Sequence, residues 1–334
     1  MKTRLTGFFL ASFLLFFATV SHAKTEIKMA ILAPENSTWF TVMKQLDDEL
    51  RQKTAGRVEL KIYAGGVLGD ERDVIRKMRI GQIHAAGFTG LGLGIINPEV
   101  RVLELPMLVS NYKEADALAA ALQPRLEKGF LDKGFVLLGW AETGFVNIFS
   151  NKPISSRKDM DGKKMWAWEG DPLVEMMYKV FKIVPIPLPL TDVLTSLQTN
   201  LIDAVYAPPL AAIALQWFTQ TKYITDLKLA DSTGGILITK KALEMLSASD
   251  SQILKDVVRK YSKILVEKTR EDNEKSYKTL LSAGLSEVKV SQKDLEMIKS
   301  TSKTVWNDLA GRLYPKALLD EAISAVEKAR SSGN

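Results

Sequence analysis

Apolar and polar positions follow two different periods along the first part of the chain. Residues 27–31 and 58–62 alternate with period two, which predicts strands. Between them, residues 39–46 carry apolar side chains at helical spacing behind polar residues 36–38, which can cap a helix. A second helix is expected over 69–81. This alternation predicts βαβ crossovers and a mainly parallel sheet.

The centre of the chain repeats the pattern. Strands are expected over residues 135–138, 145–149, 163–168 and 202–206, and Asp171-Pro172 is expected to begin a helix. The repetition indicates an α/β fold on both sides of the middle of the chain.

From Asp250 onward the chain is highly charged and carries one apolar stripe up to Gly284. One unbroken helix of that length exceeds the depth of a small lobe, so we expect it to cross two lobes. The alternative is a pair of helices broken near Asp272-Asn273.

The first residues determine the expected compartment. Lys2 and Arg4 precede an apolar run over 8–20, and residues 21–23 form a small-x-small cleavage pattern. We therefore expect residues 1–23 to be a signal peptide, cleaved after Ala23, and the mature chain to be exported. A retained N-terminal anchor is the alternative, although the apolar run is short for a membrane span.

Composition excludes several kinds of chemistry. The 334 residues contain no Cys and two His, which excludes disulfide scaffolds, thiol nucleophiles and Cys-ligated zinc. The net charge of +6 is not concentrated in a basic block, so no nucleic-acid partner is expected. The glycines of segment 90–94 lack the spacing of a phosphate-binding loop and predict a turn where backbones approach closely. We expect no enzyme activity, cofactor or metal, with an exported carboxylate-dependent hydrolase as the alternative.

A series of short motifs resembles a known family in order and spacing. The chain is similar over its mature length to the solute-binding subunits of tripartite ATP-independent periplasmic (TRAP) transporters, the dicarboxylate-binding-protein-like family. The motifs are Val67-Leu68-Gly69-Asp70-Glu71-Arg72, Glu104-Leu105-Pro106-Met107-Leu108, Gly144-Phe145-Val146-Asn147, the segment 159–165, Pro185-Ile186-Pro187, Ser196-Leu197-Gln198 and Ile202-Asp203.

The resemblance implies a two-lobe α/β periplasmic binding protein fold with hinge strands, a ligand cleft and a long helix spanning both lobes. Lobe I is expected to hold 24–143 and about 233–272, and lobe II to hold 144–232 and about 273–334. The resemblance also implies a monomer in the periplasm that captures a small organic ligand and delivers it to a TRAP permease driven by an ion gradient. A sensor that presents the solute to a receptor is an alternative.

The chain departs from the family where the resemblance places ligand contacts. Trp166 stands where members usually carry the Arg that holds a ligand carboxylate, and Val146 stands where a second Arg is common. Ala207 or Pro208 replaces a polar Asn, and Thr89 replaces an acidic residue found in some members. The chain is therefore expected to be atypical, without the usual carboxylate-binding Arg.

This exchange predicts a cleft that binds a bulky apolar or aromatic ligand, or a monocarboxylate, by burial and stacking. Glu169 and Gln216 are expected to add hydrogen bonds, together with Thr89 and Asn147. The alternatives are that the tryptophans are core residues, or that an organic acid is held by a relocated cation such as Lys164 or Arg101. The predicted ligand-binding residues are Trp166, Trp168, Val146, Phe88, Thr89, Tyr206, Ala207, Pro208, Trp39 and Asn147.

Overall fold

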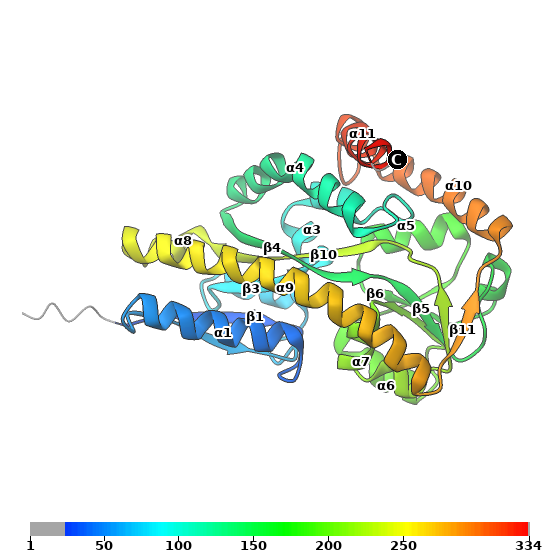
Figure 1. The fold of residues 1–334 in the computed structure, drawn as a ribbon, viewed down its shortest axis with the longest axis horizontal. Coiled ribbons are helices and arrows are strands. Elements are labelled where there is room, and N and C mark those ends of the chain that lie inside the picture. Colours follow the sequence, from blue (N-terminus) through cyan, green and yellow to red (C-terminus); the bar gives the residue numbers. More distant parts are fainter. Residues whose placement is uncertain (1–23, 333–334) are drawn as a thin grey trace, which may run out of the picture.

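The computed structural model describes residues 24–332 and contains two β-sheets with helices packed around them (Figure 1). The first sheet has the order β2 (Val58–Tyr63), β1 (Thr25–Ile31), β3 (Ala85–Thr89), β10 (Asp231–Thr239), β4 (Phe135–Phe145). The second has the order β11 (Ser286–Lys289), β9 (Tyr223–Asp226), β5 (Asn147–Ser150), β8 (Ala204–Ala207), β6 (Met165–Trp168), β7 (Pro185–Leu188).

The helices follow the apolar periodicity of the sequence. They are α1 (Thr38–Lys53), α2 (Glu71–Arg79), α3 (Gly90–Ile96), α4 (Tyr112–Asp132), α5 (Pro172–Phe181), α6 (Val193–Gln198), α7 (Pro209–Ala214), α8 (Lys240–Leu243), α9 (Ala248–Ser282), α10 (Gln292–Leu309) and α11 (Lys316–Ser331). Within residues 24–332, four 3-10 helices join them: η1 (Pro98–Glu104), η2 (Arg157–Met160), η3 (Leu190–Asp192) and η4 (Trp217–Gln220).

Short polar residues start the helices that matter for the cleft. The Ser37 hydroxyl accepts a hydrogen bond from the Phe40 N–H, and the Asp70 carboxylate accepts one from Glu71. Asp171 caps α5 in the same way, in front of Pro172, whose fixed φ suits the first helical position. These caps fix where each helix leaves its sheet.

Apart from the long helix α9, the chain crosses between the two sheets at two adjacent places. Val146 separates β4 from β5, and residues 227–230 separate β9 from β10. The Val146 N–H donates to the Ala230 carbonyl and its own carbonyl accepts from the Leu229 N–H, both at 2.9 Å. The two crossings therefore form a paired hinge. The expected lobe boundaries at 143/144 and 232/233 lie close to it.

Helix α9 runs unbroken through 35 residues, about 52 Å at about 1.5 Å per residue. It packs on β4 and α1 of the first lobe and on α7 of the second (Figure 1). The prediction of one long helix spanning both lobes is confirmed, and the alternative of a break near residue 272 is wrong.

Two sequence-based expectations differ from the structure. The first sheet is only partly parallel, because β10 returns through the hinge and pairs antiparallel with both β3 and β4. Helix α11 was expected in lobe II with the rest of 273–334, but it packs against α4 of the first lobe. The Arg330 guanidinium secures it there by donating to the Leu108 carbonyl and to Glu114.

The predicted signal peptide, residues 1–23, and its cleavage after Ala23 lie outside the described residues. Within residues 24–332, no helix combines the length and apolar character needed to cross a bilayer.

Asn273 connects α9 to both lobes, which makes its contribution measurable. Its side-chain amide donates to the Thr143 carbonyl at 2.8 Å, and its oxygen accepts from the Leu210 N–H at 3.0 Å. We expect Asn273→Ala to lower the free energy of unfolding by about 1–3 kcal/mol, because partly buried backbone groups lose their partners.

Urea unfolding monitored by circular dichroism measures this loss. Lys278→Ala, at an exposed position of the same helix, is the matched control and should change stability by less than about 0.5 kcal/mol. Equal stability of the two variants would show that Asn273 does not hold the lobes to α9.

Candidate functional site

A cavity with a volume of about 210 Å³ lies between the two lobes. Its wall comes from β1, α1 and β3 of the first lobe and from β6, β8 and α7 of the second. The surface of this wall is mostly apolar. A protein cavity of about 150 Å³ is known to hold benzene, so this one suits a compact ligand about the size of a substituted ring. We call it the main cavity.

Nine of the ten residues singled out from the sequence line the main cavity. They are Trp166, Trp168, Val146, Phe88, Thr89, Tyr206, Ala207, Pro208 and Trp39. Asn147 lies outside this wall, because its side-chain amide is directed to the Thr225 and Leu227 carbonyls beside the hinge. Glu169 and Gln216 also lie outside it. That the nine residues bind the ligand remains a prediction.

Aromatic rings form one side of the main cavity. The Trp166 ring is stacked on Tyr206 at a centroid distance of 4.7 Å. The Trp168 ring lies 5.8 Å from the Trp166 ring. Trp217 meets Trp166 edge-on at 5.2 Å and also lines the cavity. Trp166 is 1% exposed and Trp168 is 9% exposed, whereas Tyr206 is half-buried.

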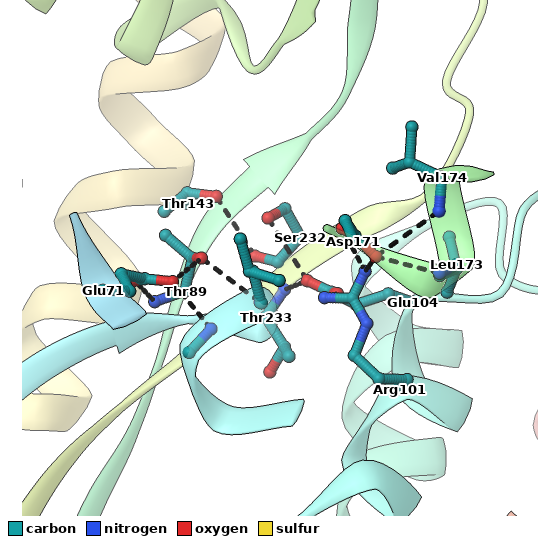
Figure 2. Close-up of polar contacts among 12 residues, drawn as sticks. Glu71, Thr89, Arg101, Glu104, Thr143, Asp171, Leu173, Val174, Ser232 and Thr233 are labelled. Carbon is teal, nitrogen blue, oxygen red and sulfur yellow. Dashed lines mark hydrogen bonds and ion pairs between the residues drawn. The ribbon is translucent and has the colours of Figure 1, made fainter. Parts of the chain in front are cut away.

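The cavity wall contains a guanidinium that the protein itself neutralises (Figure 2). Arg101 in η1 donates to both carboxylate oxygens of Asp171, at 2.8 and 3.0 Å, and forms an ion pair with Glu104 at 2.5 Å. Among the described residues that line the cavity, it is the one with a positive charge. Lys164, the other candidate for a relocated cation, is not in the wall, and its ammonium donates to the Asn200 carbonyl.

Glu71 is a second buried carboxyl in the wall. Its oxygens accept hydrogen bonds from the Thr89 N–H at 2.6 Å, the Thr89 hydroxyl at 2.9 Å and the Gly92 N–H at 2.6 Å (Figure 2). All three donors are neutral. Burial raises the pKa of Glu71 to about 8, although these donors oppose the shift. Thr89 is thus occupied by Glu71 instead of facing the cavity with a free hydroxyl.

The balance of charge in the main cavity is not cationic. Burial also raises the pKa of Glu104, although Arg101 opposes the shift. The one guanidinium is therefore paired with two carboxyl groups, those of Asp171 and Glu104, while Glu71, with its pKa raised to about 8, is bonded to neutral donors. An incoming anion finds no surplus positive charge in this wall.

The glycines of segment 90–94 make room for these charged side chains. The segment is helix α3, so the predicted turn is wrong, and the groups that come close to its glycines are side chains, not the backbone expected from the sequence. A Cβ on Gly90 would collide with the Glu104 carboxylate, one on Gly92 with Phe88 and Glu71, and one on Gly94 with the Arg101 side chain.

Further polar contacts join the lobes across the cleft. The Asp70 carboxylate accepts from the Trp168 indole N–H at 3.0 Å and from the Leu190 N–H at 3.1 Å. Arg72 donates to the Gly170 carbonyl at 2.5 Å. Arg101 and Asp171 also come from different lobes, so the described conformation is closed around the main cavity.

Sequence reasoning missed the role of Glu71, Glu104, Asp70 and Asp171. One signal was available: Arg101 and Glu104 interrupt an otherwise apolar run, Val100 to Leu108, where an unpaired charge would be costly to bury. Within the described residues, no group of acidic and histidine side chains is arranged to hold a metal ion.

Three comparisons relate the chain to known proteins. Residues 29–312 match the model of the family described as bacterial extracellular solute-binding protein, family 7. A solute-binding protein of Verminephrobacter eiseniae is 27% identical over 267 residues, 79% of each chain. The 2,3-diketo-L-gulonate-binding periplasmic protein of Escherichia coli is 25% identical over 240 residues, 71% of this chain and 73% of the relative.

The fold also matches a solved structure. The sugar acid binding protein of Advenella mimigardefordensis, in complex with galactonate, superposes with a TM-score of 0.87. The match covers 92% of this chain and 99% of that protein at 20% identity, which establishes a common fold.

The pKa of Glu71 predicts a pH-dependent stability. A carboxyl whose pKa rises from its ordinary 4.5 to about 8 on folding binds more protons in the folded state between these values. Stability should therefore fall as pH rises through this window, by about 1.4 kcal/mol per pH unit from this group. Glu71→Gln removes the titration, so we expect a flatter profile, measured by urea unfolding at pH 5, 6, 7 and 8.

The quantity to compare is the slope of the unfolding free energy against pH, not its absolute value. The Glu71→Gln protein also loses one hydrogen bond, and this loss lowers stability by the same amount at every pH, so it leaves the slope unchanged. Glu35→Gln, an exposed position, should keep the slope of the unsubstituted protein. If the Glu71→Gln protein keeps the slope of the unsubstituted protein, Glu71 does not hold a proton in the folded state.

Proposed function

The chain belongs to family 7 of the bacterial extracellular solute-binding proteins, and from this premise we propose the kind of solute it carries. It captures a compact apolar or aromatic molecule between its two lobes and delivers it to the membrane permease of a TRAP transporter. Relatives in this family are binding proteins, and this chain is not an enzyme.

The observation that carries the choice of ligand is the neutralised guanidinium. Arg101 is already paired with Asp171 and Glu104. A ligand carboxylate would have to displace one of these groups or stay unpaired, and an unpaired buried charge costs several kcal/mol. An uncharged ligand meets no such cost.

The apolar wall supplies the attraction. Burying about 150–250 Å² of ligand apolar surface contributes about 4–6 kcal/mol, and stacking on Trp168 and Tyr206 adds about 0.5–1.5 kcal/mol for each ring. Micromolar affinity requires about 8 kcal/mol, so one or two hydrogen bonds complete the binding free energy.

An organic acid is the second candidate, and three observations favour it. A relative is named for binding 2,3-diketo-L-gulonate, and the solved neighbour holds galactonate. Arg101 also lies in the wall of the main cavity. This candidate requires the Arg101–Asp171 pair to open when the acid binds.

The periplasm is the proposed place of action. The N-terminal sequence pattern supports export, and the Escherichia coli relative is named as a periplasmic protein. Delivery to a permease, in place of presentation to a receptor, follows from the TRAP resemblance. Loss of solute uptake on deletion of the partner permease genes separates these two roles.

A thermal-shift screen of the purified protein tests the ligand class. We expect indole and benzyl alcohol to raise the melting temperature by a few degrees at saturating concentration, because they stabilise only the folded state. Succinate and galactonate at the same concentration should leave it unchanged. Stabilisation by the acids alone would overturn the apolar ligand and leave the solute-binding role intact.

Releasing Arg101 from its partner gives a second test. In Asp171→Asn the guanidinium keeps only Glu104, so we expect binding of succinate or galactonate to strengthen at least tenfold, measured by calorimetry. Asp192→Asn, at an exposed position of the same lobe, is the control and should bind the acids no better than the unsubstituted protein. Unchanged acid binding in Asp171→Asn would show that this pair does not exclude anions.

A further inference from the structure

A smaller cavity of about 40 Å³ adjoins the main cavity inside the second lobe. The two share four wall residues: Pro106, Met177, Tyr206 and Leu229. The rest of the smaller wall comes mainly from β6, η2, α5 and α10. We call this space the rear chamber.

The surface of the rear chamber is apolar. Its charged wall residue, Arg157, donates to the Phe181 and Lys182 carbonyls at the end of α5, which turns its guanidinium to the helix terminus. Met160, Met165 and Met177 contribute flexible thioether side chains that can repack around a guest. Such a wall suits an alkyl group.

The partition between the two cavities has a fixed part and a movable part. The Tyr206 hydroxyl accepts a hydrogen bond from the Trp168 N–H at 3.1 Å, and its ring is stacked on Trp166. Met177 is half-buried and unbranched, with three rotatable side-chain bonds. Met177 can therefore change rotamer more readily than Tyr206 can move.

We propose that the rear chamber receives the apolar chain end of the ligand, and that Met177 moves aside to admit it. This inference rests on the proposed function and makes the ligand a compact head group with an alkyl tail. A volume of 40 Å³ holds two or three methyl-sized groups, at roughly 15 Å³ for each water-sized guest.

Ser302 offers a matched pair of variants at the far wall. It lies on α10, is fully buried, and its hydroxyl has no hydrogen-bond partner among the described residues. Ser302→Leu fills the chamber with an isobutyl group, whereas Ser302→Ala leaves it open and removes only the hydroxyl. Ile183→Phe fills the chamber from another segment, and it replaces Ser302→Leu if that protein does not fold.

The test is the affinity of 1-alkanols from butanol to dodecanol, measured by quenching of tryptophan fluorescence. Each buried methylene should tighten binding about fourfold until both cavities are full. In Ser302→Leu and Ile183→Phe the affinity should stop rising two or three carbons earlier, which weakens the best alcohol by roughly 16- to 64-fold. Short alcohols should bind all variants alike, and Ser302→Ala should keep the full length dependence.

The outcomes separate this inference from the function it rests on. An unchanged length limit in both filling variants, with short alcohols still bound, refutes the rear chamber alone. The rear chamber is also refuted if affinity stops rising at the same alcohol length in Ser302→Ala as in Ser302→Leu. Failure of every alcohol to bind, while indole still raises the melting temperature, refutes this inference alone, whereas failure of both the alcohols and indole refutes the apolar-ligand proposal as well.

Discussion

The cleft of this protein is organised by the cost of burying a positive charge. Arg101 is 4% exposed, in a region where an unpaired guanidinium would be strongly destabilising. Glu104 compensates it from the same lobe and Asp171 from the other. Because the compensating charges belong to the protein, closure of the lobes does not require an anionic ligand.

The cross-lobe pair also couples closure to the shape of the main cavity. Asp171 caps α5 as well as binding Arg101, so the start of this helix is held against the first lobe. Asp70, from the first lobe, likewise holds Trp168 of the second lobe by accepting a hydrogen bond from its indole N–H. The same indole is part of the aromatic wall of the main cavity. The contacts that close the lobes therefore bring together the apolar surface that a ligand would meet.

Local patterns in the sequence were sufficient for much of the fold. The caps at Ser37, Asp70 and Asp171 and the long apolar stripe of α9 are short-range signals, and each predicted an element that the structure contains. The antiparallel return of β10 and the packing of α11 on α4 depend on long-range contacts, which no local period encodes. The resemblance placed Trp166 at the cleft. The structure adds that the rings of Tyr206 and Trp168 pack against the Trp166 ring, which the sequence does not indicate. The pairing of Arg101 with Asp171 joins residues 70 positions apart and was equally invisible.

The central claim is that the main cavity selects against anions, and its natural occupant tests this most directly. The protein can be purified from its own periplasm without denaturation, and the bound small molecule released and identified by mass spectrometry. We expect an uncharged compound with a ring-sized apolar body in near-stoichiometric amount. A sugar acid or dicarboxylate recovered at that level would contradict the claim.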